Sequence, residues 1–433
     1  MHSSKLTTKI IFAFWLPLAV TWLMMSLEGP FLSALIARLD EPKYNLAAYG
    51  VAFAFALIIE APVIMIMSAS TALVKDKLSF SKLKNFTYTL NFILTVSMLL
   101  LILPPIFYFI TEDLIGLPHE VSFLTHLAII ILIPWPAAIG YRRFYQGILI
   151  RNNMTRRVAY GTVIRLITMT VTAIILFSFV NVPGVVVGAS ALSVAVIAEA
   201  LASKFMSLKI LKKIKDISEP INNKLTYKKI CIFYYPLALT SLITLGVQPF
   251  VTFFVGQSRM AIESLAVLPV ITSFVFIFRA LGLSYQEVVI AQIGEDRGGY
   301  IPLRNFAIIL GSISTIILFV ISFTHLSDIW FNDVSGLSKT LTDFAKLPLM
   351  IMAVFPALTV LISFQRAALV NIKKTKPITL GTASEFIIII ISMFLAVKLF
   401  SIVGAVAAAV SFVLGRLSAN IYLTPYFLKA VKK

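Results

Sequence analysis

The sequence predicts an all-α integral membrane protein with twelve transmembrane helices, arranged as two six-helix lobes related by a pseudo-two-fold axis along the membrane normal. Three observations predict this fold class. Hydrophobic residues fill 59% of the 433 positions and charged residues 13%, and the mean hydropathy is +0.95, far above that of a soluble domain. Apolar runs long enough to cross a bilayer as helices recur along the whole chain. The two halves of the chain also repeat each other.

Each apolar run of about 20 residues is long enough to cross a hydrocarbon core of roughly 30 Å as a helix. The expected spans cover residues 10–38, 46–74, 86–110, 121–150, 157–180, 184–208, 229–256, 262–291, 303–327, 340–370, 376–399 and 402–428. A transmembrane β-barrel is excluded because these runs are too long for tilted strands and do not alternate with a period of two residues.

The net charge of +18 is a signal of topology rather than of nucleic-acid binding. Most of the 37 Lys and Arg residues lie in the two termini and in alternate loops. These basic segments are Lys75 to Lys84, Arg151 to Arg157, Lys204 to Lys229, Arg297 to Arg304, Lys373 to Lys376 and Lys429 to Lys433. The positive-inside rule therefore predicts a multi-pass protein of the cell (inner) membrane with both termini in the cytoplasm.

The internal repeat defines the two lobes. A shift of 219 aligns FWLPLAVT at 14–21 with FYYPLALT at 233–240. A shift of 220 aligns residues 135–162 with 355–382, with matches at Pro136, Phe144, Leu149, Thr155, Gly161 and Thr162. We expect an N-terminal lobe at 1–208, a basic cytoplasmic linker helix at 209–228, and a C-terminal lobe at 229–433. Because each lobe has six helices, both lobes point the same way across the bilayer.

Two pairs of equivalent positions carry opposite charges within predicted spans. Glu60 aligns with Arg279 at the first shift, and Arg165 aligns with Glu385 at the second. An unpaired charge inside a membrane costs several kcal/mol, so such groups form pairs or line a wet cavity. We therefore expect these four residues to line a cleft between the lobes and to exchange partners as the lobes rock. The alternative is that they form static ion pairs within each lobe and fix helix packing.

Further intramembrane charges are candidates for binding. Arg143 and Arg366 are candidate ligands for carboxylates or phosphates, which a guanidinium binds in a bidentate manner; for Arg143 the alternative is that the side chain snorkels toward the cytoplasm. Glu28 lies directly before Gly29 and Pro30, where the helix is expected to bend, and is the candidate site for a coupling ion, H⁺ or Na⁺. Its alternative role is a hydrogen bond to a neighbouring helix. Charges assigned with less specificity are Arg142, Glu199, Glu287 and Arg416, of which Glu199 and Arg416 are expected to serve packing.

Several kinds of chemistry have no support in the sequence. No phosphate-binding loop, HExxH motif or GxSxG motif occurs, so we expect no ATP-driven step, no catalytic residues and no enzyme. Cys231 is the only cysteine, and the four histidines are scattered, so neither a metal site nor another cofactor is expected. The proline-marked repeats instead favour a transporter that works by alternating access.

Several segments in fixed order resemble a known superfamily: LPLAVT with Glu28, LAAYGVAFAFAL, GILIRNNMT, FYYPLALT with QPFVTFFV, FPALTV with IKKTK, and SIVGAVAAAV. In these segments the chain resembles the multidrug/oligosaccharidyl-lipid/polysaccharide exporter (MOP) superfamily, and most closely the progressive ankylosis protein family. The resemblance implies export of organic anions such as citrate, nucleotides or pyrophosphate, with arginines in the cleft as ligands. The chain lacks the long polar C-terminal tail of the animal members and has Glu28 where the multidrug and toxic compound extrusion (MATE) branch has an aspartate in its first helix.

The sequence analysis thus predicts a rocker-switch secondary transporter of organic anions. Two alternatives remain: a proton- or sodium-coupled multidrug/cation antiporter of the MATE type, and a lipid-linked saccharide flippase. The expected partners are an anionic small molecule and the lipid bilayer, without nucleic acid, and a monomer is expected.

Overall fold

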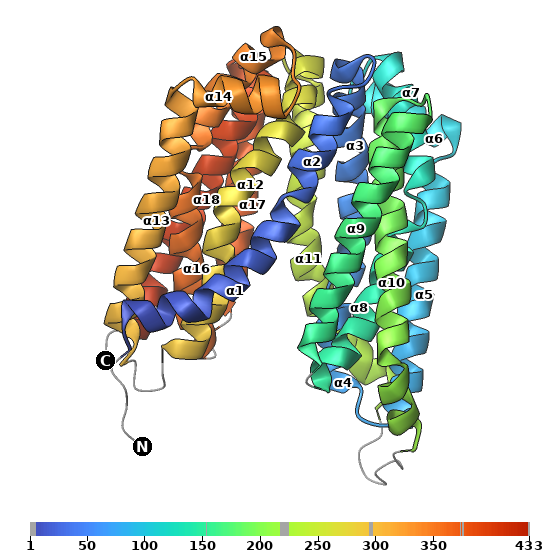
Figure 1. Ribbon diagram of the computed structural model, residues 1–433, viewed down its shortest axis with the longest axis vertical. Coiled ribbons are helices and arrows are strands. Elements are labelled where there is room, and N and C mark those ends of the chain that lie inside the picture. Colours follow the sequence, from blue (N-terminus) through green and yellow to red (C-terminus); the bar gives the residue numbers. More distant parts are fainter. Residues whose placement is uncertain are drawn as a thin grey trace. The chain divides into compact units, whose positions relative to one another are not determined.

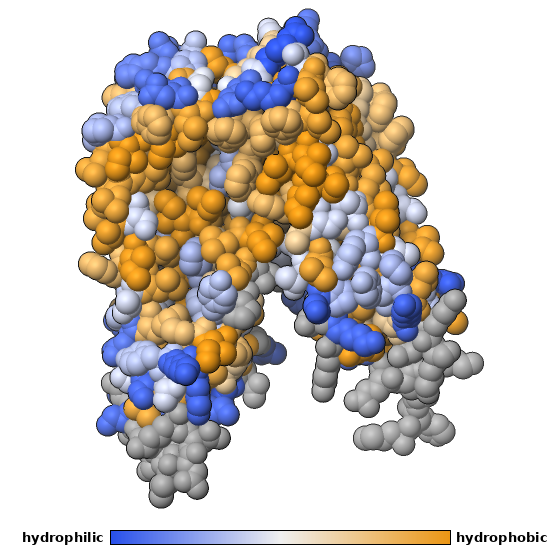
Figure 2. All heavy atoms as spheres, turned by 180° about the vertical axis from the view of Figure 1, so that it is seen from behind, coloured by the Kyte–Doolittle hydropathy of each residue, from blue (hydrophilic) through white to orange (hydrophobic). Residues whose placement is uncertain are grey.

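The computed structural model describes residues 6–152, 154–216, 225–293, 298–372, 374 and 376–431, which contain helices and no strands. Eleven helices in this part of the chain are long and apolar enough to cross a membrane. There are twelve if the bent pair Lys77–Leu101 and Pro104–Leu114 forms one span. The predicted all-α membrane fold is confirmed. Hydrophobic side chains cover the middle of the helices, and hydrophilic ones gather at their ends (Figure 2).

The helices follow one another in the order shown in Figure 1. The first half contains α1 (Thr8–Ser26), α2 (Glu28–Ile36), α3 (Pro42–Glu60), η1 (Ala61–Val63), α4 (Ile66–Leu73), α5 (Lys77–Leu101), α6 (Pro104–Tyr108), η2 (Phe109–Leu114), α7 (His119–Ile131), α8 (Trp135–Arg151), α9 (Thr155–Phe179) and α10 (Gly184–Asp216). The second half contains α11 (Tyr227–Gly256), α12 (Ala261–Gln292), α13 (Tyr300–Phe323), α14 (Leu326–Asp328), η3 (Ile329–Val334), α15 (Lys339–Met352), α16 (Phe355–Asn371), α17 (Lys376–Phe394), η4 (Leu395–Leu399) and α18 (Gly404–Val431).

The two sequence shifts reappear in the backbone. Glu41 and Met260, which are 219 residues apart, both adopt the left-handed conformation directly before a long helix. Gly116 and Gly336, 220 residues apart, both have positive φ angles of 84° and 72°, which glycine adopts without steric cost. Each of these glycines follows a short π-helix, η2 or η3. The equivalence of the two halves therefore extends to their irregular turns.

The first two spans of the first half are interrupted, whereas the equivalent spans of the second half, α11 and α12, are continuous. α1 ends at Ser26 and α2 begins at Glu28, while the equivalent α11 runs without a break. Pro30 has no N–H to donate to the carbonyl of Ser26, which explains the predicted bend. α3 likewise ends at Glu60, and Pro62 lies in the 3₁₀ turn η1.

Gly282 lies within α12, which is continuous from Ala261 to Gln292. A Cβ added at Gly282 would lie 3.0 Å from the backbone nitrogen of Val360, so the glycine allows α12 to pack closely on α16.

The third predicted span, 86–110, has different bounds in the structure. α5 begins at Lys77 and ends at Leu101, and the chain then turns by 77° into α6. Pro104 and Pro105 explain the turn, because a residue before proline avoids helical conformation, and Leu103 is extended with ψ 122°.

The predicted linker helix also differs. Residues 209–216 continue α10 rather than starting a new helix, because no helix breaker precedes them and the apolar residues Leu211 and Ile214 are buried. Residues 217–224 lie outside the described part of the chain.

The chain forms two compact units. Unit 1 comprises Met1–Arg38 and Phe253–Lys433, and unit 2 comprises Leu39–Thr252. The predicted lobes therefore differ from the units at the first and seventh spans: α1 and α2 belong with the second half of the chain, and most of α11 belongs with the first half.

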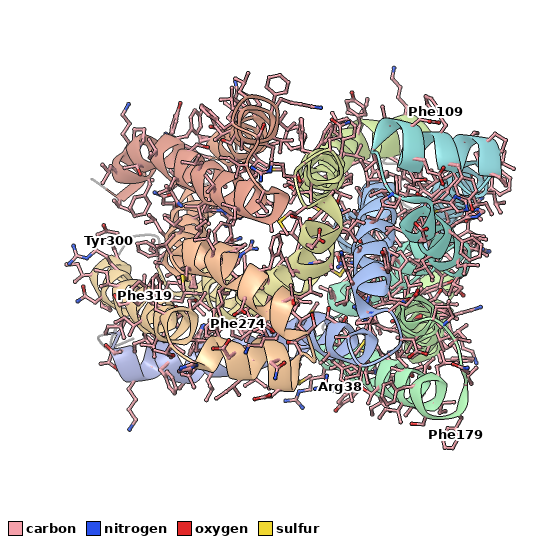
Figure 3. All side chains as sticks on the ribbon, turned by 90° about the horizontal axis from the view of Figure 1, so that it is seen from above. Arg38, Phe109, Phe179, Phe274, Tyr300 and Phe319 are labelled. Atoms are coloured by element: carbon pink, nitrogen blue, oxygen red, sulfur yellow. The ribbon has the colours of Figure 1, made fainter. Side chains whose placement is uncertain are left out.

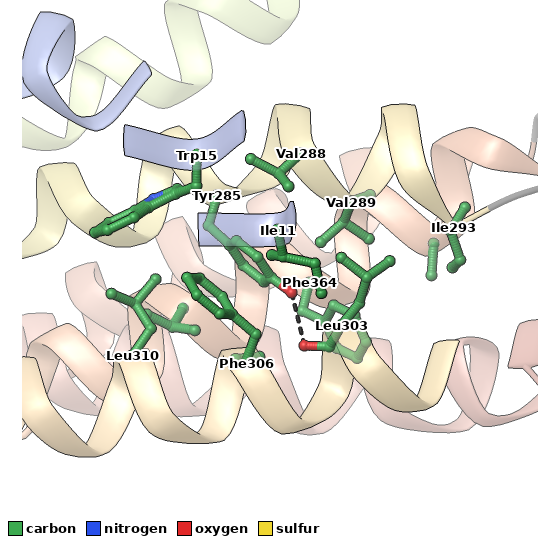
Figure 4. Packing of buried hydrophobic residues seen from close by; sticks show 14 of the residues in the cluster. Ile11, Trp15, Tyr285, Val288, Val289, Ile293, Leu303, Phe306, Leu310 and Phe364 are labelled. Carbon is green, nitrogen blue, oxygen red and sulfur yellow. Dashed lines mark hydrogen bonds between the residues drawn. The ribbon is translucent and has the colours of Figure 1, made fainter. Parts of the chain in front are cut away.

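Side-chain contacts explain why α1 and α2 belong to unit 1. The indole Nε1 of Trp15 donates to Ser284 Oγ at 2.9 Å, and Trp15 packs in an apolar cluster with α12, α13 and α16 (Figure 4). In the same cluster, the Tyr285 hydroxyl donates to the Leu303 carbonyl at 2.6 Å. At the end of α2, Arg38 donates to the carbonyls of Asp333 and Val334, both at 2.7 Å.

Figure 3 views the helices from one end. Tyr300 and Phe319 on α13 lie at the edge of unit 1, and Phe319 is 49% exposed. Phe274 on α12 is buried among the helices of the unit, where its ring stacks on Trp330 at a centroid distance of 4.1 Å. The outer face of α13 therefore carries exposed apolar side chains and is expected to face lipid.

In unit 2, Gly147 allows α8 to approach α4 closely. A Cβ at this position would lie 2.4 Å from the Met67 carbonyl oxygen and 2.6 Å from Ser70 Cβ. We expect Gly147→Ala to lower the free energy of unfolding by about 1–3 kcal/mol, because the backbone contact must open. The matched control is Gly161→Ala, whose Cβ would lie 3.5 Å from its nearest neighbour. Denaturant titration in detergent measures both, and equal effects would contradict this view of the contact.

Candidate functional site: two buried charge clusters

Unit 2 contains a carboxylate at the broken end of a helix. Glu60 is the last residue of α3 and is only 5% exposed. The indole Nε1 of Trp135, the first residue of α8, donates a hydrogen bond to Glu60 Oε2. Glu60 also experiences the positive charges of Arg142, Arg143 and Arg165. Glu60 is thus part of a charge cluster built by α3, α8 and α9 within one unit.

The second carboxylate of this cluster is Glu199 on α10, which is 1% exposed. It accepts a hydrogen bond from Arg142 and another from Gln146 Nε2 at 3.0 Å. A guanidinium nitrogen of Arg165 lies 3.9 Å from Glu199 Oε2. One carboxylate therefore binds side chains from two neighbouring helices.

Arg143 is placed differently from Arg142. Its guanidinium lies 3.8 Å from the Met67 sulfur, a weak acceptor, and its Nε is buried without a hydrogen-bond partner. Within the described part of the chain, no carboxylate lies within ion-pair distance of Arg143. The side chain is half-buried. Arg143 therefore lies within the field of Glu60 and Glu199 without forming an ion pair with either.

Unit 1 contains an equivalent cluster on the equivalent helices α12, α16, α17 and α18. Glu385 on α17 accepts from Arg416 on α18, with nitrogen-to-Oε1 distances of 2.9 and 2.8 Å. Arg366 on α16 lies 4.0 Å from the other oxygen of Glu385 and donates to Thr382 Oγ1 at 3.1 Å. Glu385 thus holds two guanidinium groups, as Glu199 does in unit 2.

Arg279 on α12 is stacked on an aromatic ring instead of being paired with an acid. Its guanidinium carbon lies 4.5 Å from the ring centroid of Phe355, and that of Arg416 lies 5.2 Å from the same centroid. Among the described residues, Arg279 makes no hydrogen bond or ion pair, and its Nε is buried. Cation–π attraction offsets part of the cost of this charge.

The internal repeat relates the two aromatic side chains. Phe355 aligns with Trp135 at the shift of 220, just as Arg279 aligns with Glu60 at the shift of 219. An acid faces an indole N–H in unit 2, and a guanidinium faces a phenyl ring in unit 1. The indole N–H of Trp135 stabilises the negative charge of Glu60, and the face of the Phe355 ring stabilises the positive charge of Arg279.

The candidate coupling residue Glu28 begins α2 and is 8% exposed. It lies beside the break between α1 and α2. A Cβ added at the next residue, Gly29, would lie 2.7 Å from Ser273 Cβ, so α2 packs tightly on α12 here. Glu28 is therefore enclosed at a helix–helix contact within unit 1.

The structure brings together part of each predicted set. Glu60, Arg143 and Arg165 share the cluster of unit 2. Arg366 and Glu385 lie together in unit 1, and Arg279 experiences the charge of Glu385. The pairings across the two halves, Glu60 with Arg279 and Arg165 with Glu385, remain predictions.

Sequence reasoning missed the roles of Trp135, Gln146 and Phe355 and assigned Glu199 and Arg416 to packing alone. Glu199 and Arg416 do form ion pairs within one unit, but their partners include the candidate residues Arg165 and Glu385. The shift of 220 that aligns Trp135 with Phe355 was the available signal.

Guanidinium groups outnumber carboxylates in both clusters. Three guanidinium groups face two carboxylates in unit 2, and three face one in unit 1. Arginines bind carboxylates and phosphates through fixed pairs of N–H groups. Among the described residues, no group of three or more His, Cys, Asp or Glu side chains could hold a metal ion.

Comparison with solved structures identifies proteins that share this fold. The sequence matches no protein-family profile and no curated protein. A multidrug resistance MATE family transporter of the MOP superfamily shares the fold with a TM-score of 0.75 and 16% identity, covering 95% of this chain and 94% of the other. The lipid II flippase MurJ aligns with a TM-score of 0.72 and 17% identity over 96% of this chain and 90% of its own.

A third structure is a MOP superfamily transporter from Pyrococcus furiosus Vc1, described by a reverse polarity of its binding pocket. Its TM-score is 0.61 at 15% identity, covering 99% of this chain and 96% of the other. At these identities the likeness concerns the fold alone. The chain therefore has the fold of MOP superfamily transporters, as the sequence resemblance predicted, and the likeness to the progressive ankylosis family remains a prediction.

Proposed function

We propose that this protein is a secondary transporter that exports small organic anions by alternating access. The observation that carries the proposal is the presence of half-buried guanidinium groups, Arg143 in unit 2 and Arg279 in unit 1, without a carboxylate partner in the described structure. Burying an unpaired charge is costly, so such groups are retained where a ligand of opposite charge completes them. The shared fold with MOP superfamily transporters supports a transport role.

In this proposal the arginines divide into two roles. Arg143, Arg279 and Arg366 bind the carboxylate or phosphate groups of the substrate. Glu60, Arg165 and Glu385 set the local field and change partners as the protein alternates between its two open states. Citrate-like, nucleotide-like and pyrophosphate-like anions fit this chemistry, in agreement with the resemblance to the progressive ankylosis family. A monomer in the inner membrane, with both termini in the cytoplasm, completes the proposal.

A second candidate is a flippase for lipid-linked saccharides. The fold it shares with the lipid II flippase MurJ supports this candidate, and the diphosphate of such a lipid would also bind guanidinium groups. A third candidate is a MATE-type antiporter of cations, supported by the likeness to the multidrug transporter and by the buried acids Glu28 and Glu60. For coupling we propose Glu28, whose protonation or Na⁺ binding would be linked to movement at the break between α1 and α2.

Transport by purified protein in proteoliposomes tests these proposals. Labelled citrate, ATP, a lipophilic cation and a lipid-linked diphosphate are offered separately under imposed proton and sodium gradients. We expect saturable movement of citrate or ATP, and a loss of the response to the gradient in Glu28→Gln. Movement of the cation alone would overturn the anion proposal in favour of the antiporter. Movement of a lipid-linked diphosphate without citrate or ATP would favour the flippase.

A further inference from the structure

Unit 1 has an open groove on the outer side of α13. The groove has a volume of about 330 Å³ and lies between α13, α16 and α18. Its floor contains the rings of Tyr300, Phe364 and Phe427, which contact one another with centroid distances of 5.4 to 6.3 Å. Its walls include Ile308 and Leu361, which are 59% and 41% exposed. This is an apolar groove on a surface expected to face lipid.

The internal repeat places larger side chains at the equivalent positions of unit 2. Five groove positions have larger counterparts at the shift of 220: Ala307, Ile308, Gly311, Ser312 and Leu361 correspond to Thr87, Tyr88, Asn91, Phe92 and Tyr141. The rings of Tyr88 and Tyr141 stack at 5.9 Å with an interplanar angle of 17°. Asn91 reaches across the helix contact and donates to the Ala137 carbonyl at 3.1 Å.

Other groove positions change in the opposite direction. Val360 and Phe427 are larger than their counterparts Gly140 and Ser207. These larger residues add apolar area to the floor, while Gly311 and Ser312 contribute little bulk to the lining. The lining is therefore particular to the second half of the chain.

A cation lies at one end of the groove. Arg304 lines it and is exposed, with its guanidinium carbon 5.9 Å from the Tyr300 ring centroid. Its only hydrogen bond in the described structure is to the Asn305 side chain at 3.3 Å. Lys84 is the equivalent residue in unit 2, where its amine lies 5.7 Å from the ring of Tyr88.

The dimensions of the groove suit one leaflet. Its lining on α13 extends from Tyr300 to Ser312, which at 1.5 Å per residue spans about 18 Å. Half of a hydrocarbon core of roughly 30 Å is about 15 Å. The charged end belongs to the basic segment Arg297 to Arg304, which the positive-inside rule assigns to the cytoplasm.

We propose that this groove binds an anionic phospholipid of the cytoplasmic leaflet. One acyl chain lies along Ile308, Gly311 and Leu361, and the phosphate group binds the guanidinium of Arg304. Burial of acyl methylenes supplies affinity, and the charge supplies the preference for an anionic over a zwitterionic headgroup. The site is separate from the buried charge clusters and does not depend on the transport proposal.

Thermal unfolding of the full-length protein in detergent tests the site. We expect added phosphatidylglycerol to raise the Tm by several degrees more than phosphatidylcholine does. Arg304→Gln should remove this difference between the two lipids. The double variant Ile308→Tyr with Leu361→Tyr, which copies the filling of unit 2, should remove the response to phosphatidylglycerol. Lys84→Gln is the matched control and should respond like the wild type.

Native mass spectrometry gives a second readout that does not depend on the folding of the double variant. The wild type should retain one more phosphatidylglycerol than Arg304→Gln does, and an equal number would overturn the proposal. Equal Tm shifts by both lipids, or a full response in a folded double variant, would also overturn it. Concentration-dependent dimers that disappear in the double variant would instead indicate a second copy in the groove.

Discussion

Replacing Glu199 with alanine is expected to lower the free energy of unfolding by about 3–5 kcal/mol, among the largest effects of any single substitution in this chain. Glu199 is almost fully buried and accepts hydrogen bonds from Arg142 and Gln146, with Arg165 at 3.9 Å. Removing the carboxylate leaves the Arg142 guanidinium in a low-dielectric interior without its ion-pair partner. The loss comes from this stranded charge more than from the lost hydrogen bonds.

Denaturant titration in detergent measures this loss, and two controls make it specific. Glu120→Ala removes an exposed carboxylate of α7 and should change stability by no more than about 0.5 kcal/mol. Glu199→Ala combined with Arg142→Met removes one stranded charge and should recover part of the loss. If the double variant is as unstable as the sum of the single variants, the ion pair is not what stabilises α8 against α10.

The sequence predicted most of this fold because the signals for membrane helices are strong and local. Twelve apolar runs and the interruption at Glu28 to Pro30 required no knowledge of tertiary contacts. The bend after Leu101 was missed because hydropathy does not distinguish an apolar helix that crosses the bilayer from one that turns through 77° at a proline pair.

The membership of α1 in unit 1 could not be predicted from the repeat. Equivalent segments in a duplicated chain have similar apolar faces, so α1 could pack against either half with similar burial. The choice depends on particular contacts, such as Trp15 with Ser284 and Arg38 with the carbonyls after η3. No periodic pattern in the sequence records these contacts.

The sequence predicted which residues belong to the candidate site more reliably than it predicted which residues they contact. Glu60, Arg165, Arg279 and Glu385 stood out because each breaks an apolar run and has an inverted charge at its equivalent position. Their partners lie on helices distant in the sequence, and alignment by repeat says nothing about contacts within a unit. Glu199 has no charged counterpart at the shift of 220, where Ala419 stands, so the repeat gave no reason to select it.

Replacing Arg279 with methionine is expected to reduce anion transport by about 10- to 100-fold while leaving the Tm equal or higher. The transport loss corresponds to one charge-assisted hydrogen-bonding group, worth about 1.5–3 kcal/mol. Stability should not fall, because Arg279 lacks a carboxylate partner in the described structure and methionine packs well against the Phe355 ring. A substitution that removes a destabilising charge and also removes transport is expected where a residue is retained for binding.

Arg416→Met is the control that separates this role from packing. Arg416 approaches the same Phe355 ring but donates to Glu385, so its removal takes away the two shortest contacts of this buried carboxylate and should lower the Tm. Arg279→Lys keeps the charge but lacks the planar fork of N–H groups, and transport should fall to an intermediate level. If Arg279→Met transports anions like the wild type, or destabilises the protein as Arg416→Met does, Arg279 serves the packing of unit 1 and the anion is bound elsewhere.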